Sequence, residues 1–233
     1  MHLFFAPDIA NNPVLPEEES AHAVRVLRLE AGETVLVLDG QGGVYQATIA
    51  VAHPKHCVLN SLERVTPSAP RPYRLHIAIA PTKNMDRLEW FVEKAAEIGI
   101  DEISPVFCRF SERKVLKCER LQKILVSAMK QSKQAFLTQL NEPCTFKEFV
   151  TRATADQKFI AHCHEADKRL LSHEVRKATS VLVMIGPEGD FSDEEVALAL
   201  QNGYVPVSLG ETRLRVETAA LVACHTVAVI NEL

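Results

Sequence analysis

The chain has 233 residues, which suffices for one large domain or two modest ones. Hydrophobic residues make up 47% of it and charged residues 24%, so the chain can bury a core and is not intrinsically disordered. Its formal net charge of -4 argues, taken alone, against binding to nucleic acid.

Targeting and redox signals are few in this sequence. The N-terminal stretch MHLFFAPDIANNP has no basic segment and no long apolar run, which predicts that there is no signal peptide. No stretch approaches the roughly 18–20 apolar residues of a membrane helix. The 6 cysteines never form a CxxC pair, a usage typical of free thiols in a cytoplasmic protein.

Residues 1–70 are predicted to form a small, mainly β domain. The elements, in chain order, are a strand at 3–5, a helix at 16–30 and strands at 33–39, 43–51 and 56–65, with the turn DGQGG after the second strand. The proline-rich segment TPSAPRP at 66–72 marks the domain boundary.

From residue 71 to residue 233 the pattern alternates between strands and helices. Strands are predicted at 73–80, 102–107, 158–163, 180–186 and 204–209, and helices at 84–100, 116–136, 145–153, 167–178, 192–202 and 218–233. Such alternation indicates an α/β domain with a largely parallel sheet that helices cover on both faces. Ligands bind such sheets beyond the carboxyl ends of the strands, where two unusual loops, GPEGDFS and GETRLRVE, are expected.

The loop GPEGDFS connects an apolar strand to a helix. Gly186 and Gly189 allow the backbone to approach a ligand closely, and Ser192 with Glu195 forms a capping-box pattern at the helix start. The loop lacks GK[ST], and its acidic side chains would repel phosphate, so it is not a phosphate-binding loop. It suits a ligand with hydroxyls, an amine or a positive centre, and a tight structural connection is the alternative.

The stretch LGETRLRVETA is a more specific indication of function than the GPEGDFS loop. It places Arg215 and Glu217 between an apolar strand and an apolar helix, where charged side chains are costly unless they are paired or functional. A buried ion pair between the two is one interpretation. The other is that Arg215 faces a substrate while Glu217, near the start of the helix, orients it or the loop.

Basic charge is concentrated in one segment. Residues 103–134 hold eight basic and two acidic residues, a net charge of +6, whereas residues 135–233 hold nine basic and fourteen acidic ones, a net charge of -5. Such a basic face can bind phosphates, because charges act within about 8 Å, or it is simply a solvated helix face. Arg25 and Arg28, three residues apart, are predicted on one face of the helix at 16–30, where they contact phosphates or are exposed.

The sequence HCHE at 162–165 contains two candidate metal ligands. His162 and His164 point to opposite faces if the strand continues through them, which is poor geometry for one ion. No metal site is therefore predicted.

Taken together, five segments resemble the small-subunit ribosomal RNA methyltransferase E family. They are AHAVRVLRL, APTKNMDRLEWFVEKAAEIGIDEISPVFCRFSERK, AMKQSKQA, MIGPEGDFSDEEV and SLGETRLRVETAALVA, in the family's order over nearly the whole chain. Members methylate N3 of one uridine in 16S ribosomal RNA with S-adenosylmethionine. The resemblance implies a PUA-like RNA-binding β-barrel at 1–70 and, at 71–233, a SPOUT-type methyltransferase domain with a C-terminal trefoil knot. It further implies a cytoplasmic homodimer whose active sites are completed across the interface.

Residue roles follow from the matched motifs of that family. The implied cofactor contacts are Ile185, Gly186, Glu188, Gly189, Leu209, Gly210, Leu214 and Thr218. The implied RNA contacts are Arg25, Arg28, Lys83, Arg113 and Lys114. The sequence departs from commoner relatives at Lys130, Asp190, Glu211 and Thr212, which puts the RNA contacts in question more than the chemistry.

The implied reaction requires N3 of the uridine to lose its proton. Arg215 is expected to stabilise the resulting anion, because its charged planar fork matches a delocalised anion. Glu217 either holds that guanidinium, which we favour, or relays the proton through water. Two rivals are a non-catalytic RNA-binding protein that keeps the fold and a nucleotide-dependent enzyme, and the second lacks both GxGxxG and Walker A motifs.

Overall fold

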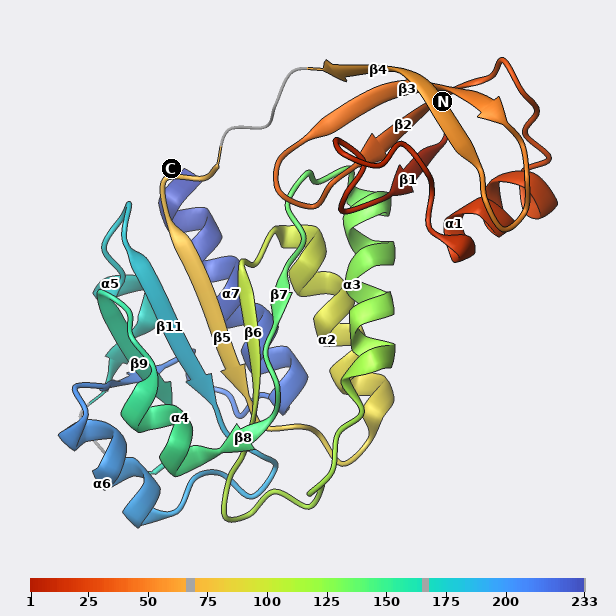
Figure 1. The fold of residues 1–233 in the computed structure, drawn as a ribbon. Coiled ribbons are helices and arrows are strands. Elements are labelled where there is room, and N and C mark those ends of the chain that lie inside the picture. Colours follow the sequence, from red (N-terminus) through yellow and green to blue (C-terminus); the bar gives the residue numbers. More distant parts are fainter. Residues whose placement is uncertain (66–69, 165–167, 233) are drawn as a thin grey trace. The chain divides into compact units, whose positions relative to one another are not determined.

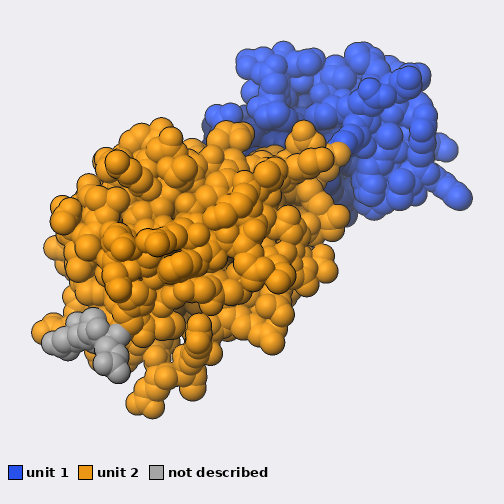
Figure 2. Space-filling model, turned by 90° about the horizontal axis from the view of Figure 1, so that it is seen from below, with its two compact units in different colours: residues 1–70, 129–137 blue, residues 71–128, 138–233 orange. Residues whose placement is uncertain are grey.

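The computed structural model describes residues 1–65, 70–164 and 168–232, so most of the predicted linker lies outside the described residues. The chain divides into two compact units, coloured separately in Figure 2. The first unit comprises Met1–Pro70 and Met129–Leu137, and the second comprises Arg71–Ala128 and Thr138–Leu233. No helix of the described residues is long and apolar enough to cross a membrane.

The first unit is built on a four-stranded sheet in the order β1-β2-β3-β4. Its strands are β1 (Leu3–Phe5), β2 (Thr34–Leu38), β3 (Val44–Val51) and β4 (Val58–Val65). β1 and β2 are parallel and the other pairs antiparallel. The alternating apolar side chains of the strands, such as Val35, Val37 and Ile49, are buried in the core of this unit.

The predicted helix at 16–30 is confirmed up to Val26 and wrong in its last residues. Helix α1 (Glu17–Ala21) continues as a π-helical turn, η1 (His22–Val26), and Arg28 has a left-handed φ of 57°. A left-handed residue commonly ends a helix, and here it turns Leu29 back into the core, where Leu29 is 6% exposed. Arg25 and Arg28 are both exposed, but they do not share one helix face.

The segment Met129–Leu137 belongs to the first unit through specific contacts. The Gly42 N–H donates to the Ala135 carbonyl at 2.9 Å. The Lys130 ammonium lies 2.6 Å from the Glu19 carboxylate, with the two side chains only 23% and 13% exposed. The lysine that departs from the family pattern is therefore the partner of a largely buried carboxylate.

The second unit contains an eight-stranded sheet with the order β10-β12-β9-β11-β5-β6-β7, and β8 pairs with β6. The strands are β5 (Arg74–Ile79), β6 (Glu102–Phe107), β7 (Gln139–Leu140), β8 (Cys144–Thr145), β9 (Gln157–Ala161), β10 (Arg169–Leu170), β11 (Ser180–Ile185) and β12 (Val205–Ser208). Every pairing is parallel, which confirms the predicted sheet type. The three strands that were not predicted have two residues each, too few to show a period.

Helices lie on both faces of this sheet, as predicted. They are α2 (Met85–Ile98), α3 (Cys118–Ser132), α4 (Phe146–Arg152), α5 (Leu171–Glu174), α6 (Asp193–Gln201) and α7 (Val216–Glu232). Figure 1 shows α4 and α6 on one face and α2 and α7 on the other. Phe146, Phe149 and Val150 of α4 pack on the apolar side chains of the central strands.

Of the helix predicted at 167–178, Asp167 lies outside the described residues and only a short part is confirmed. Arg169 and Leu170 are extended and pair with Val207 and Ser208 of β12, so only the four residues of α5 are helical behind them. Pairing at the sheet edge has overridden the local helical pattern.

Sequence signals for α2 and α6 are confirmed. In α2 the buried residues recur at helical spacing, the Asn84 side chain caps the N-terminus, and Gly99 ends the helix at a φ of 102°. In α6 the predicted capping box of Ser192 and Glu195 forms, with each side chain bonded to the other's backbone N–H. Both caps place a helix N-terminus beside the carboxyl ends of the strands.

Candidate active site

Three neighbouring strands end at one edge of the parallel sheet. β9 ends at Ala161, β11 at Ile185 and β12 at Ser208, and the loops that follow them enclose two adjoining cavities of about 320 and 280 Å³. The residues that line both cavities are Ala161, Cys163, Arg213, Leu214 and Ala219. A ligand-sized site therefore lies where the sequence predicts it, beyond the carboxyl ends of the strands.

The structure brings most of the predicted cofactor residues to these cavities. Ile185, Gly186 and Glu188 line the first cavity, Leu209 and Gly210 line the second, and Leu214 lines both. The other two residues of the set, Gly189 and Thr218, line neither of these cavities.

Packing explains the two glycines of the GPEG loop. A Cβ atom on Gly186 would lie 3.0 Å from Cε2 of Phe191, and one on Gly189 would lie 2.9 Å from Cβ of Phe110. Both distances are too short for an unstrained contact. The glycines therefore let the loop pack on two phenylalanine side chains, a reason that differs from the close ligand approach predicted from sequence.

Both predicted catalytic residues line the first cavity. Glu217 lies in the first turn of α7, as predicted, and is only 8% exposed, whereas Arg215 is exposed. Glu217 Oε1 lies 3.8 Å from Nε of Arg87, so its ion pair is with Arg87. The favoured expectation that Glu217 holds the guanidinium of Arg215 is therefore wrong. Its other oxygen, Oε2, is buried and has no hydrogen-bond partner among the described residues.

Arg87 also lines the first cavity, and sequence reasoning missed it. It lies in the first turn of α2, the helix that follows the carboxyl end of β5. β5 is the neighbour of β11 in the sheet, so the start of α2 reaches the same edge. The signal was present, because charged residues in the first turn after a parallel strand lie near the ligand site.

Backbone carbonyls and amides hold the loop between β5 and α2 in place. Glu188 Oε1 accepts a hydrogen bond from the Lys83 N–H at 2.9 Å. Arg113 donates to the carbonyls of Thr82 and Lys83 at 3.2 and 2.7 Å, and Lys83 Nζ lies 2.7 Å from Glu112. The side chains of the predicted RNA-binding residues Lys83 and Arg113 thus already contact other groups of the protein.

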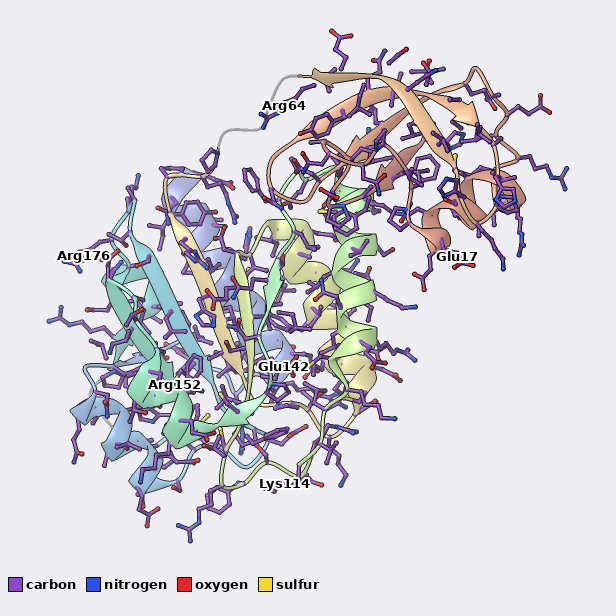
Figure 3. The ribbon with its side chains drawn as sticks, viewed as in Figure 1. Glu17, Arg64, Lys114, Glu142, Arg152 and Arg176 are labelled. Carbon is purple, nitrogen blue, oxygen red and sulfur yellow. The ribbon has the colours of Figure 1, made fainter. Side chains whose placement is uncertain are left out.

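The other cations of the basic segment show similar contacts. Lys114, labelled in Figure 3, lies on the loop between β6 and α3 and donates to the carbonyls of Cys108 and Arg109. Arg109 pairs with Glu194 at 3.1 Å, and Arg120 pairs with Glu89 at 2.6 Å. Carboxylates therefore balance part of the positive charge found in the sequence, and backbone carbonyls accept from other cations of the segment.

β9 ends at Ala161, so the strand does not continue through His162 and His164, and Glu165 of the HCHE segment lies outside the described residues. The rings of His162 and His164 meet edge to face, with centroids 5.2 Å apart. His164 bonds to a carboxylate oxygen of Asp193 at 2.9 Å and to the Phe191 carbonyl at 2.8 Å. Asp190, at a left-handed φ of 65°, accepts from the N–H of Cys163 at 2.7 Å, which ties this segment to the GPEG loop.

Two histidines, the buried His162 and the half-buried His76, are held neutral. Burial, with the nearby Lys168 ammonium as the second cause, lowers the pKa of His162 from 6.5 to about 4. Burial also lowers the pKa of His76 to about 4, against an opposing effect of Glu102. His76 lies on β5 at a third cavity, of about 650 Å³, which Glu142 and Arg152 also line (Figure 3).

We expect these two histidines to make the fold sensitive to acid. Because the folded-state pKa lies below the unfolded one, their contribution is complete above about pH 6.5 and is lost as the pH falls towards about 4. Each contributes about 2–3 kcal/mol to the free energy of unfolding. Urea unfolding between pH 7.5 and 4.5 should show a smaller pH dependence for His76→Asn than for the native chain. His173→Asn, at an exposed site, should leave the dependence unchanged, and an equal dependence in all three proteins would contradict the prediction.

Comparison with known proteins agrees with this architecture. Residues 69–228 match the RNA methyltransferase domain family, and residues 15–60 match the RNA methyltransferase PUA domain family. A ribosomal RNA small subunit methyltransferase E from Synechocystis sp. is 32% identical over 217 residues, which cover 89% of this chain and 70% of the relative.

Solved structures share the fold over the whole chain. A probable rRNA methyltransferase from Porphyromonas gingivalis is 40% identical, with a TM-score of 0.92 and coverage of 100% of this chain and 99% of the other. A ribosomal RNA small subunit methyltransferase E from Neisseria gonorrhoeae, bound to S-adenosylmethionine, is 25% identical, with a TM-score of 0.83 and coverage of 99% and 98%. The chain belongs to the ribosomal RNA small subunit methyltransferase E family.

Proposed function

We propose that this protein transfers a methyl group from S-adenosylmethionine to N3 of a uridine in the RNA of the small ribosomal subunit. The observation that carries the proposal is the convergence of Arg87, Arg215 and Glu217 on a cavity between the GPEG loop and the start of α7. The family relationship and the cofactor bound to the Neisseria gonorrhoeae relative support the reaction type.

The two adjoining cavities fit the proposed cofactor. Their volumes are those of a small-molecule site, and their walls combine apolar side chains with backbone of three loops. Buried polar atoms of His162 and Glu217 beside them have no partner among the described residues, which is typical of groups that a ligand satisfies. Ile185, Gly186, Leu209, Gly210 and Leu214 are the residues that would hold it.

When bound, S-adenosylmethionine supplies a methyl group made electrophilic by the adjacent sulfonium. The chain must therefore position the uridine and manage the proton on N3. Arg215, exposed at the wall of the first cavity, stabilises the negative charge that develops on N3 and on the flanking carbonyl oxygens.

Glu217 is the carboxylate that takes this proton, directly or through water. Among the other carboxylates of the first cavity, Asp190 already accepts from two backbone N–H groups, and Glu188 accepts from the Lys83 N–H. Glu217 differs in having a buried oxygen without a donor among the described residues. Arg87 holds the Glu217 carboxylate at the cavity wall.

The N-terminal domain, residues 1–70, is proposed to hold the RNA, and residues 71–233 to carry out the chemistry. Arg25 and Arg28 are exposed and contact phosphates, whereas Lys83, Arg113 and Lys114 shape the loop beside the cavity and bind RNA through their remaining donors. The trefoil knot, a cytoplasmic location and a homodimer that completes the active site are part of the same proposal. Trp90, 43% exposed on α2, is a candidate residue for that dimer interface.

The test of the cofactor site is calorimetric titration with S-adenosylhomocysteine. We expect micromolar binding of this ligand and none of ATP or NAD, because the loops lack both phosphate-binding motifs. Mass spectrometry of ribosomal RNA from cells that lack the gene should then show one missing methyl group. Binding without any loss of methylation would favour an RNA-binding protein that has kept only the fold.

RNA affinity is expected to fall steeply with salt, because each phosphate contact releases counterions. Removing both exposed arginines, in the double variant Arg25→Ala and Arg28→Ala, should lower the slope of log affinity against log salt by about 2. Fluorescence anisotropy of a labelled RNA fragment between 50 and 300 mM salt measures that slope. Arg169→Ala, which removes one exposed arginine of the second unit, is the control, and an unchanged slope in the double variant would exclude these two contacts.

A further inference from the structure

His162 is an unusual group at the wall of the second cavity. Its side chain is buried, with the residue 8% exposed, yet neither ring nitrogen has a hydrogen-bond partner among the described residues. Both ring nitrogens of His164, two residues away, are bonded. Unpartnered buried polar groups are rare in folded proteins because they have lost water without compensation.

The backbone around His162 is fixed on both sides. The Lys168 ammonium donates to the carbonyls of His162 and His164, each at 2.6 Å. The next residue, Cys163, donates its N–H to Asp190 at 2.7 Å. The imidazole is therefore kept at the cavity wall by contacts of its neighbours, although no bond of its own holds it there.

The ring is neutral at physiological pH, because burial and the nearby Lys168 ammonium lower its pKa to about 4. A neutral imidazole offers one N–H donor and one nitrogen acceptor. A ligand that satisfies it must therefore present both an acceptor and a donor, and it need carry no charge.

The two cavities differ in the charges that line them. Arg87, Glu188 and Glu217 line the first cavity and not the second, which suits the reacting atoms and the charged amino-acid end of the cofactor. The second cavity is lined largely by β12 and the loop that follows it, together with His162. Of its charged residues, Arg213 also lines the first cavity, Lys168 donates to two backbone carbonyls, and Glu211 is exposed. The uncharged adenosine part of the cofactor, with its hydroxyls, amine and ring nitrogens, matches this second lining.

We propose that His162 is a positioning residue that hydrogen-bonds the adenosine part of S-adenosylmethionine, an inference that rests on the proposed function. Each ring nitrogen exposes less than 1 Å², so bonding requires the ring to turn about its side-chain torsions towards the cavity. Ligand binding should thus change the environment of both nitrogens.

Nuclear magnetic resonance of protein labelled with 15N in histidine tests this inference directly. The two nitrogen signals of His162, assigned by their absence in His162→Phe, should shift on addition of S-adenosylhomocysteine to those of one fixed tautomer. In calorimetry His162→Phe, which keeps a ring but no hydrogen bond, should bind S-adenosylhomocysteine about three- to ten-fold more weakly. The same factor is expected for 5′-methylthioadenosine, which contains the adenosine part alone. His173→Phe, at an exposed site, should show native affinity.

The outcomes separate this inference from the proposed function. If the native protein does not bind S-adenosylhomocysteine, the proposed function fails. If the native protein binds it while the His162 signals stay unmoved and His162→Phe binds equally well, His162 only packs and the inference is overturned. If thermal unfolding shows that His162→Phe does not fold, the His162 nitrogen signals are assigned with His162→Gln instead. The shifts of these signals in the native protein then decide whether His162 bonds the ligand.

Discussion

Arg215→Ala is expected to slow methyl transfer about 100-fold while changing the affinity for S-adenosylhomocysteine less than about two-fold. The guanidinium lines the first cavity but is exposed, so its removal leaves no buried group without a partner. A donor aimed at charge that develops only in the transition state affects the rate rather than ligand binding. Arg215→Lys should recover only part of the rate, because an ammonium cannot contact N3 and a carbonyl oxygen together.

Single-turnover methylation of small ribosomal subunits that lack the modification measures the chemical step. Calorimetry on the same preparations measures cofactor affinity. The control is Arg169→Ala, which removes one exposed arginine from the same unit outside the cavities. Equal losses of rate and cofactor affinity in Arg215→Ala would show that the residue only holds the loop together, and the catalytic role would be abandoned.

Local signals predict those parts of the fold that are determined by local interactions. The capping box at Ser192, the helical spacing of apolar residues in α2 and the alternation of strands and helices correspond to observed elements. The helices predicted at 16–30 and 167–178 are longer than the observed ones, because the first ends before a left-handed Arg28 and the second yields to pairing of β10 with β12. Neither event leaves a periodic signal in the sequence.

In the candidate site, too, local sequence signals reveal some residues, and contacts between distant segments determine the others. Arg215 and Glu217 are found because charged residues interrupt an apolar pattern, and both line the first cavity. The partner of Glu217 is Arg87, 130 positions earlier in the numbering, and no local pattern can reveal a contact between two helices so distant in sequence. Likewise the sequence shows a net positive segment but not the distant carboxylates of Glu89 and Glu194, which pair with two of its arginines in space.

Glu217→Gln is expected to slow methyl transfer about 100-fold at neutral pH, because the amide cannot accept the N3 proton. The rate of the variant should then rise about tenfold per pH unit, since hydroxide must replace the carboxylate as the base. The native enzyme should show a flatter profile over the same range. If Glu217 only positions Arg87, the variant would be slower by a constant factor with an unchanged pH profile.

The Arg87–Glu217 pair permits a double-mutant cycle that separates electrostatics from chemistry. Arg87→Ala leaves a buried carboxylate without its counter-ion, so we expect it to lower the free energy of unfolding by about 1–2 kcal/mol and to slow the reaction less than Glu217→Gln does. Adding Glu217→Gln to Arg87→Ala removes the buried charge, so the double variant should regain stability while remaining as slow as Glu217→Gln alone. Trp90, the single tryptophan and one helical turn from Arg87, reports the unfolding by fluorescence. If the stability losses of the two single variants add up to that of the double variant, the two side chains do not interact. The 3.8 Å separation between Arg87 and Glu217 would then contribute nothing to stability.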